Sequence, residues 1–188
     1  MPRAGLNRDA VVALAVELLD ADPGAPLTLA AVAARAGVAV PSLYKHLGSL
    51  DELRDGVAVV GVTRIADAVD GAAAAHDGFA AFAAAARAIR VEARAHPALY
   101  LASQPAPGRA ASPALVAAGE RAVAALAAVL GRAGVAADRE VDAVRIVRAA
   151  VHGFVLLETS GAFGLPDDVE ASFERMLDVV WAGLATLH

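Results

Sequence analysis

Hydrophobic residues recur every three or four positions along most of the chain, which is the spacing of helices with one buried face. In the first such segment, Val11, Leu14, Ala15 and Leu18 mark that face. No segment alternates apolar and polar residues as a half-buried strand does. The pattern therefore predicts an all-α fold of about nine helices. The expected helices cover residues 8–20, 29–36, 41–47, 50–75, 79–95, 98–103, 113–133, 138–159 and 167–187.

Residues that begin or end helices separate the first of these segments. Thr28 is a suitable N-cap, because its hydroxyl can accept a hydrogen bond from a backbone N–H of the first turn. Gly37 is expected to end that helix, since glycine readily adopts a positive φ. Pro41 suits the first turn of the next helix. Ser49 and Glu52 predict a capping box for the long helix that follows.

The two short helices between residues 28 and 47 are the part of the chain that indicates a function. Leu43 and Leu47 lie four positions apart and are expected to face inward, so that Ser42, Tyr44 and Lys45 point mostly outward. A short helix presenting a hydroxyl, a phenol and an ammonium suits the major groove of DNA. Similar helical corners occur in enzymes, so an all-helical enzyme or small-molecule-binding protein without DNA binding remains the alternative.

This segment resembles the helix-turn-helix of TetR/AcrR-type transcriptional repressors. The residues that carry the resemblance are Thr28, Val32, Ala33, Ala36, Gly37, Val38, Pro41, Leu43, Tyr44, His46, Leu47 and Leu53. The resemblance implies a ligand-responsive repressor that binds a palindromic double-stranded DNA operator as a homodimer. It also implies a three-helix DNA-binding head in residues 1–56, joined by a long helix to an effector-binding and dimerisation domain in residues 57–188.

The DNA contacts that this resemblance implies lie on the second short helix and around it. They are Arg3, Arg8, Thr28, Val40, Pro41, Ser42, Tyr44, Lys45 and His46. Lys45 is suited to the O6 and N7 atoms of guanine, and Tyr44 and His46 are expected to hold phosphates. The N–H groups at the start of the next helix also suit a phosphate.

Three positions depart from the family pattern. Ala39 stands where the family usually has Ser or Thr, and it gives up about 1 kcal/mol of helix capping. Leu50 replaces a lysine that usually contacts a phosphate. Leu47 replaces a phenylalanine, which changes only the packing.

The C-terminal part resembles a branch of TetR-type regulators marked by a His-Gly pair, an apolar run and Glu, here at His152-Gly153 and Glu158. The effector is not identified by the sequence; its expected contacts are Arg94, Tyr100, Gln104, Arg148 and His152. A buried histidine satisfied by a neighbouring group is the alternative for His152. The implied dimer interface, on the helices over 138–159 and 167–187, is Gly153, Leu157, Phe173, Leu177, Val180 and Leu184. The same stripe could instead be intramolecular core.

Composition limits the class of protein further. Apolar residues make up 58% of the chain and the mean hydropathy is +0.55, but no 18-residue window lacks both charge and proline. We therefore expect no membrane span, and no signal peptide begins the chain. Cysteine is absent, which excludes disulfides and thiolate catalysis and suits a cytoplasmic protein.

The net charge is unfavourable for a nucleic-acid binder, which would have to place a few cations on one face, and the polar motifs indicate no enzyme. The net charge is −5, and acidic residues outnumber basic ones even within residues 1–56. Lys45, on the proposed reading helix, is the only lysine. No catalytic, cofactor-binding or metal-binding arrangement stands out, and the i, i+4 pair Glu92 and His96 lacks further ligands. The arginines expected on solvated faces are Arg87, Arg90, Arg94 and Arg121.

Overall fold

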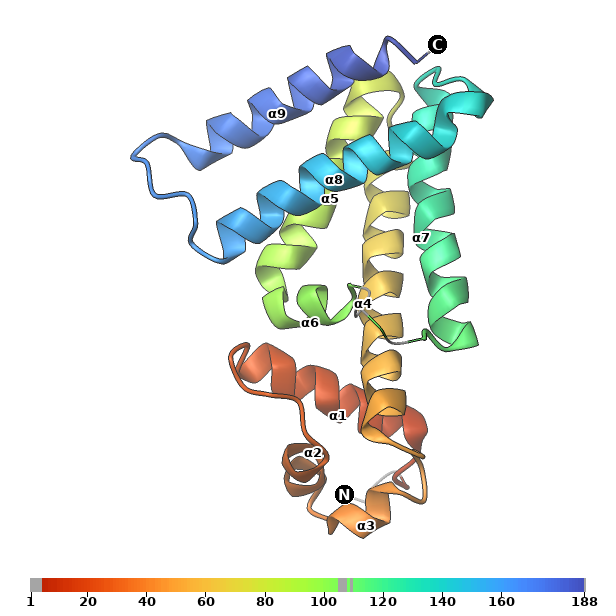
Figure 1. The fold of residues 1–188 in the computed structure, drawn as a ribbon, viewed down its shortest axis with the longest axis vertical. Helices are drawn as coiled ribbons and strands as arrows, with labels where there is room; N and C mark the ends of the chain where they lie inside the picture. The colour runs from red at the N-terminus through yellow and green to blue at the C-terminus, as the bar shows by residue number, and fades with distance from the viewer. Residues whose placement is uncertain (1–4, 105–107, 109, 188) are drawn as a thin grey trace. The chain divides into compact units, whose positions relative to one another are not determined.

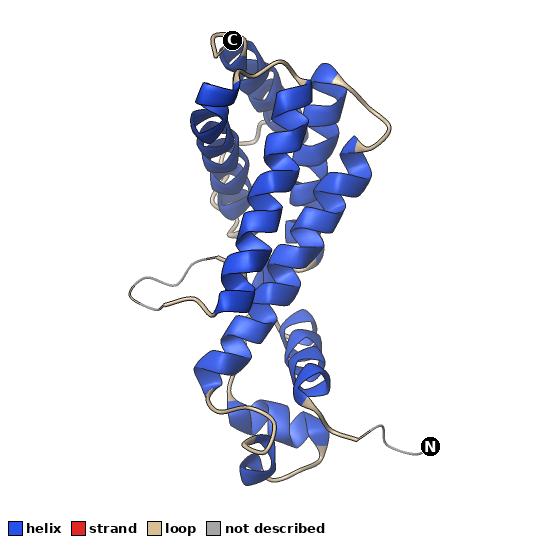
Figure 2. Ribbon diagram, turned by 90° about the vertical axis from the view of Figure 1, so that its right-hand side faces the viewer, coloured by secondary structure: helices blue, strands red, loops and turns tan. Residues whose placement is uncertain are grey.

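The computed structural model describes residues 5–104, 108 and 110–187, and within them every regular element is a helix (Figures 1 and 2). The all-α prediction is therefore confirmed. The elements are α1 (Arg8–Ala21), α2 (Leu29–Ala36), α3 (Val40–Leu43), α4 (Leu50–Ala73), α5 (Gly78–Ala95), α6 (Pro97–Ala102), α7 (Pro113–Arg132), the 3-10 turn η1 (Ala137–Arg139), α8 (Glu140–Thr159) and α9 (Val169–Leu184).

The chain divides into two compact units. The first consists of the described residues up to 63 together with 96–119, and the second of residues 64–95 and those from 120 onward. Helices α4 and α7 run from one unit into the other, whereas α6 belongs to the first. The predicted domain boundary after residue 56 falls inside α4 and stays a prediction.

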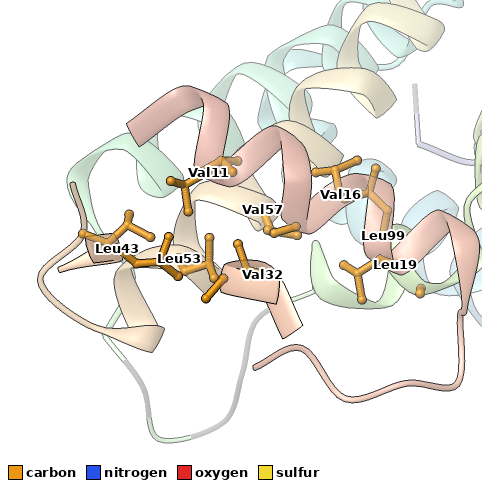
Figure 3. Close-up of a cluster of buried hydrophobic side chains, with 13 residues drawn as sticks. Val11, Val16, Leu19, Val32, Leu43, Leu53, Val57 and Leu99 are labelled. Atoms are coloured by element: carbon orange, nitrogen blue, oxygen red, sulfur yellow. The ribbon is translucent and has the colours of Figure 1, made fainter. Parts of the chain in front are cut away.

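The first unit, which we call the head, is built around a small apolar core. Helices α1 to α4 and α6 contribute to it, as Figure 3 shows, with Val11, Val32, Leu43 and Leu53 fully buried. Close packing of α1 on α4 depends on Gly56, because a Cβ there would lie 2.6 Å from Cγ2 of Val12. Because Leu43 of α3 is buried in this core, the opposite side of α3 is the one exposed to solvent.

The structure confirms the expected ends of α2 and the expected start of α4. The Thr28 hydroxyl accepts a hydrogen bond from the Ala31 N–H (3.1 Å), and Gly37 has a φ of 68°. Ser49 accepts from the Glu52 N–H (3.1 Å). The Glu52 carboxylate reaches back one residue further than a capping box requires and accepts from the Gly48 N–H (2.7 Å).

Helix α3 is shorter than predicted. It contains four residues, and Tyr44, Lys45 and His46 form a hydrogen-bonded turn after it. Its N-cap, Ala39, makes no side-chain hydrogen bond, so the first turn lacks the support that a Ser or Thr would give. The expectation of a helix over 41–47 was therefore wrong in its length.

In the second unit, α5, α8 and α9 pack on one another around Phe82, Val147, Phe173 and Leu177. Trp181 of α9 lies against Phe82, with ring centroids 5.6 Å apart. The predicted N-cap of α8, Asp138, lies instead within η1, and α8 begins after it without a side-chain cap. Asp168 caps α9, accepting from the Glu170 N–H (2.8 Å).

Helix α7 alone among the described helices has the length and hydropathy to cross a membrane. This is weak evidence, because a core helix of a globular protein passes the same test. Arg121 of α7 pairs with Asp67 and Asp70 of α4 at 2.6 and 3.1 Å, and Val129 and Leu130 near its end are buried. The apolar window of α7 is 33% buried, so these contacts cover one part of the helix and leave the rest exposed.

Candidate nucleic-acid interface

Helix α3 and the turn that follows it present a polar face to solvent. Leu43 and Leu47 are buried in the head core, at 0% and 2% exposure, as their spacing predicted. Tyr44 is 56% exposed and Lys45 is also exposed, while His46 is half-buried. The phenol and the ammonium therefore lie on the surface although they follow the helix rather than belong to it.

Of the other proposed contacts on this segment, Pro41 is exposed, and Val40 and Ser42 are half-buried. Thr28 is also half-buried, and its hydroxyl oxygen is used to cap α2. The structure thus brings Val40 to His46 together in one segment, with Thr28 at the start of the preceding helix. Arg3 lies outside the described residues.

The cations of the head differ in their partners. Arg8 pairs with Glu52 at 3.0 Å, Arg35 with Glu17 at 3.0 Å, and Arg54 with Asp51 at 2.9 Å. Among the described lysines and arginines of residues 5–63, Lys45 is the one for which the structure records no ion pair. Its charge is therefore not neutralised locally, which favours Lys45 as the residue that meets a polyanion.

The start of α4 is less suited to a phosphate than the sequence suggested. Ser49 and Glu52 already accept hydrogen bonds from two backbone N–H groups there. The hydrogen bond from the Gly48 N–H, followed by the one from Arg8, lowers the pKa of the Glu52 carboxyl. The carboxylate is thus charged at neutral pH, and it opposes a phosphate at this helix end.

The five proposed effector contacts are divided between the two units. Tyr100 (buried) and Gln104 belong to the head, where the Gln104 side-chain amide donates to the Tyr100 carbonyl (3.2 Å). Arg94, Arg148 and His152 belong to the second unit. Burial, and then the charge of Arg148, lower the pKa of His152 below its usual value, so the imidazole is neutral at pH 7.

The proposed interface stripe contains residues of two kinds. Phe173, Leu177 and Leu184 are buried within the second unit at 0–3% exposure, so their side chains pack in the subunit core and cannot meet a partner. The alternative that the sequence left open, intramolecular core, describes these three residues, because periodicity finds an apolar face without telling what covers it. The others differ: Leu157 is 47% exposed, and Gly153 and Val180 are half-buried.

Two exposed apolar residues near this stripe escaped prediction. Ile146 on α8 is 46% exposed and Val179 on α9 is 72% exposed. Ile146, Gly153 and Leu157 share one face of α8, spaced by seven and four residues. On α9, Met176, Val179 and Gly183 are spaced in the same helical manner. We call these six residues the outer face of α8 and α9.

One arginine expected on a solvated face is in the interior. Arg90 is 5% exposed and hydrogen-bonds to Glu158 and Glu170. The side chains of Arg87, Arg94 and Arg121 are exposed, as expected. No signal in the sequence near Arg90 distinguished it, because both of its partners lie far along the chain.

Comparisons with known proteins identify the family. Residues 82–180, more than half of the chain, match the family model described as "Tetracyclin repressor-like, C-terminal domain". An HTH-type transcriptional regulator of Mycobacterium tuberculosis is 34% identical over 183 residues, which cover 96% of this chain and 83% of that protein.

Solved structures share the fold. A protein of unknown function from Rhodococcus sp. RHA1 has a TM-score of 0.80 and 26% identity, with 97% of this chain and 96% of that chain covered. A TetR variant from Acinetobacter baumannii AYE in complex with minocycline has a TM-score of 0.70 and 24% identity, over 97% and 98% of the two chains. The comparisons favour a DNA-binding regulator over an all-helical enzyme.

Proposed function

Since this chain belongs to the TetR family of DNA-binding transcriptional regulators, we propose that it is a homodimeric repressor of a palindromic operator, controlled by a small-molecule effector. The observation that carries the proposal is the exposed pair Tyr44 and Lys45 on a segment anchored by buried Leu43 and Leu47. We further infer that it belongs to the branch marked by His152-Gly153, and that it acts in the cytoplasm.

Each residue of the exposed segment has a role that its chemistry suits. Lys45 and Ser42 contact base edges, with the ammonium directed to the O6 and N7 atoms of guanine. Val40 and Pro41 contact thymine methyl groups. Tyr44 and His46 hold phosphates and fix the register, as do Thr28 and the N-terminal arginines Arg3 and Arg8. Arg8 has to exchange Glu52 for a phosphate in order to take part.

The dimer forms through the outer face of α8 and α9. This face offers Ile146, Leu157 and Val179 to solvent in the isolated subunit, with Gly153 and Gly183 allowing close approach of helices. A twofold dimer presents two reading segments, which demands an operator with two half-sites about 34 Å apart. Small changes in subunit geometry therefore alter the affinity.

The effector binds residues of the second unit. A protein with the same fold, the TetR variant from Acinetobacter baumannii, has been solved in complex with a small molecule, minocycline. Arg148 and His152 lie one turn apart on α8, and a neutral imidazole can both donate and accept a hydrogen bond. Arg94 is a further candidate in the same unit, whereas Tyr100 and Gln104 belong to the head and are candidates for a separate contact. The effector releases the operator by favouring a dimer whose half-site spacing no longer matches.

A gel-shift titration tests the function. The DNA is the region upstream of the protein's own gene, and the affinity is measured at two salt concentrations with unrelated DNA as competitor. We expect a discrete dimer complex that weakens as salt rises, and a footprint with twofold symmetry. Equal affinity for operator and competitor DNA, or no binding at low salt, would reject the proposal.

A further inference from the structure

Arg90 is the most deeply buried charged side chain of the second unit among the described residues, and its guanidinium has several partners. Its Nε and one Nη donate to the two carboxylate oxygens of Glu158, at 2.8 and 2.7 Å. The other Nη donates to Glu170 at 2.8 Å. The group thus makes a bidentate pair with one carboxylate and a single bond with another, which fixes the plane of the guanidinium.

Aromatic rings hold the same guanidinium from another side. Its central carbon lies 4.4 Å from the ring centroid of Phe173 and 5.8 Å from that of Phe154. Phe154 in turn contacts Phe163, with ring centroids 4.8 Å apart. The rings come from α8, α9 and the loop between them, so the cation is set among the residues that close the hairpin of these two helices.

The two acidic partners mark the two sides of this hairpin. Glu158 lies in the last turn of α8, and Glu170 is the second residue of α9. Figure 1 shows α8 and α9 joined by the loop over residues 160–168, with α5 packed against them. A single side chain of α5 therefore ties the end of one helix to the beginning of the next.

Charge balance makes the removal of Arg90 alone costly. Glu158 lies at a helix C-terminus, where a negative charge is unfavourable without a nearby cation. Its side chain is only 15% exposed, and the hydrogen bonds from Arg90 lower the pKa of its carboxyl. Without the guanidinium, the largely buried Glu158 would keep only the exposed Arg94 as a cation, 3.9 Å away, and would lose its hydrogen bonds. The ends of α8 and α9 would then separate.

We propose that Arg90 is a positioning residue for dimerisation, which sets the arrangement of α8 against α9 and thereby forms the outer face that a second copy of this chain binds. The inference rests on the proposed dimeric function. Arg90 is an interior residue and does not belong to the outer face. It nevertheless determines whether the α8 residues and the α9 residues of that face lie in one surface.

Arg87 supplies a matched comparison on the same helix. Its recorded ion pair within the described part of the chain is with Glu174 of α9, with its Nε 2.8 Å from one carboxylate oxygen, and its side chain is 48% exposed. Arg87 therefore joins α5 to α9 without bridging to α8. Removing it takes away the same charge from the same helix while leaving the hairpin tied.

The test compares four full-length chains by sedimentation equilibrium and by chemical unfolding: the parent, Arg87→Met, Arg90→Met and the double variant Arg90→Met/Glu158→Leu. The double variant removes the buried charge together with its partner, which commonly restores stability. We expect Arg87→Met to dimerise like the parent, and Arg90→Met to dimerise at least about tenfold more weakly. The double variant regains the unfolding midpoint but not the dimer affinity.

The outcomes separate the inference from the function beneath it. A parent chain that is monomeric at all concentrations would overturn the proposed function, and the inference with it. A dimeric parent with a folded Arg90→Met that associates equally well would overturn the inference alone. Recovery of both stability and association in the double variant would also overturn it, since Arg90 would then act only as a counter-charge. If Arg90→Met does not fold, the dimer affinity of the folded double variant tests the inference: weak association supports it, and association equal to the parent overturns it.

Discussion

The guanidinium of Arg8 donates a hydrogen bond to the carboxylate of Glu52 over 3.0 Å, joining the start of α1 to the start of α4. The same carboxylate accepts the Gly48 N–H, two residues beyond His46. A fixed negative charge is thus built into the edge of the proposed DNA-binding segment. A phosphate bound at this edge would therefore meet a carboxylate.

Replacement of this carboxylate should strengthen DNA binding. In Glu52→Gln the amide oxygen can still accept from Gly48, while the negative charge is lost and Arg8 becomes available to a phosphate. We expect the operator affinity to rise by about threefold to tenfold, with the salt slope steeper by about one. Fluorescence anisotropy at two salt concentrations measures both. Glu140→Gln, the same change in the second unit, serves as the control, and an unchanged or weaker affinity of Glu52→Gln would contradict the expectation.

The exposed pair of the reading segment should be required for binding but not for folding. Lys45→Ala and Tyr44→Ala each remove a side chain that the head core does not use. We expect each to weaken operator binding by at least about tenfold, the value of one good base or phosphate contact, without loss of the dimer. Gel shift and size-exclusion chromatography report the two properties. Arg139→Ala removes an exposed charge elsewhere and should bind normally; full binding by both head variants would reject this reading surface.

A serine in place of Ala39 should stabilise the head. Ala39 has the extended backbone of an N-cap (φ −79°, ψ 148°) but no side chain to accept a hydrogen bond. Ala39→Ser is expected to raise the free energy of unfolding by about 0.5–1 kcal/mol, because it supplies the missing acceptor. Urea unfolding measures the gain. Thr28→Ala, which removes the cap that α2 does have, should lose a similar amount. A loss of stability in Ala39→Ser would contradict this account of α3.

Two glycines of α4 should respond oppositely to alanine. At Gly56 a Cβ would lie 2.6 Å from the Val12 side chain, whereas at Gly71 no atom lies within 4 Å. Gly56→Ala is expected to destabilise by about 1–3 kcal/mol through overpacking, while Gly71→Ala gains up to about 1 kcal/mol of helix propensity. Thermal unfolding compares them. Stabilisation by Gly56→Ala would show that α1 and α4 pack less closely than described.

Protonation of His152 should reduce stability in mild acid. Burial, and then Arg148, hold its pKa in the folded state below the usual 6.5, so the unfolded chain binds the proton more tightly. Stability therefore rises with pH through the interval just below 6.5, as the unfolded state loses its extra proton. Chemical unfolding across this interval should give a flatter dependence for His152→Gln than for the parent. Equal slopes for the variant and the parent would contradict the expectation.

Sequence reasoning succeeded where one residue and its near neighbours decide the structure. The ends of α2 follow from Thr28 and Gly37, because an N-cap and a positive φ are properties of single residues acting within a turn. The inward direction of Leu43 and Leu47 follows from helical spacing in the same way. The exposed position of Lys45 could be inferred as well, since its anchors are adjacent. These local rules carried the family resemblance and the nature of the binding segment.

Only the tertiary structure decided which apolar and charged side chains are covered. Phe173 and Leu177 are core whereas Val179 is exposed, because helices distant in sequence pack on one side of α9 and not on the other. Arg90 is buried, and its partners Glu158 and Glu170 lie 68 and 80 residues further along the chain. The sequence around Arg90 therefore could not indicate its burial. Helical periodicity gives each helix a stripe, but only the packing of helices against one another determines what faces that stripe and which charges meet.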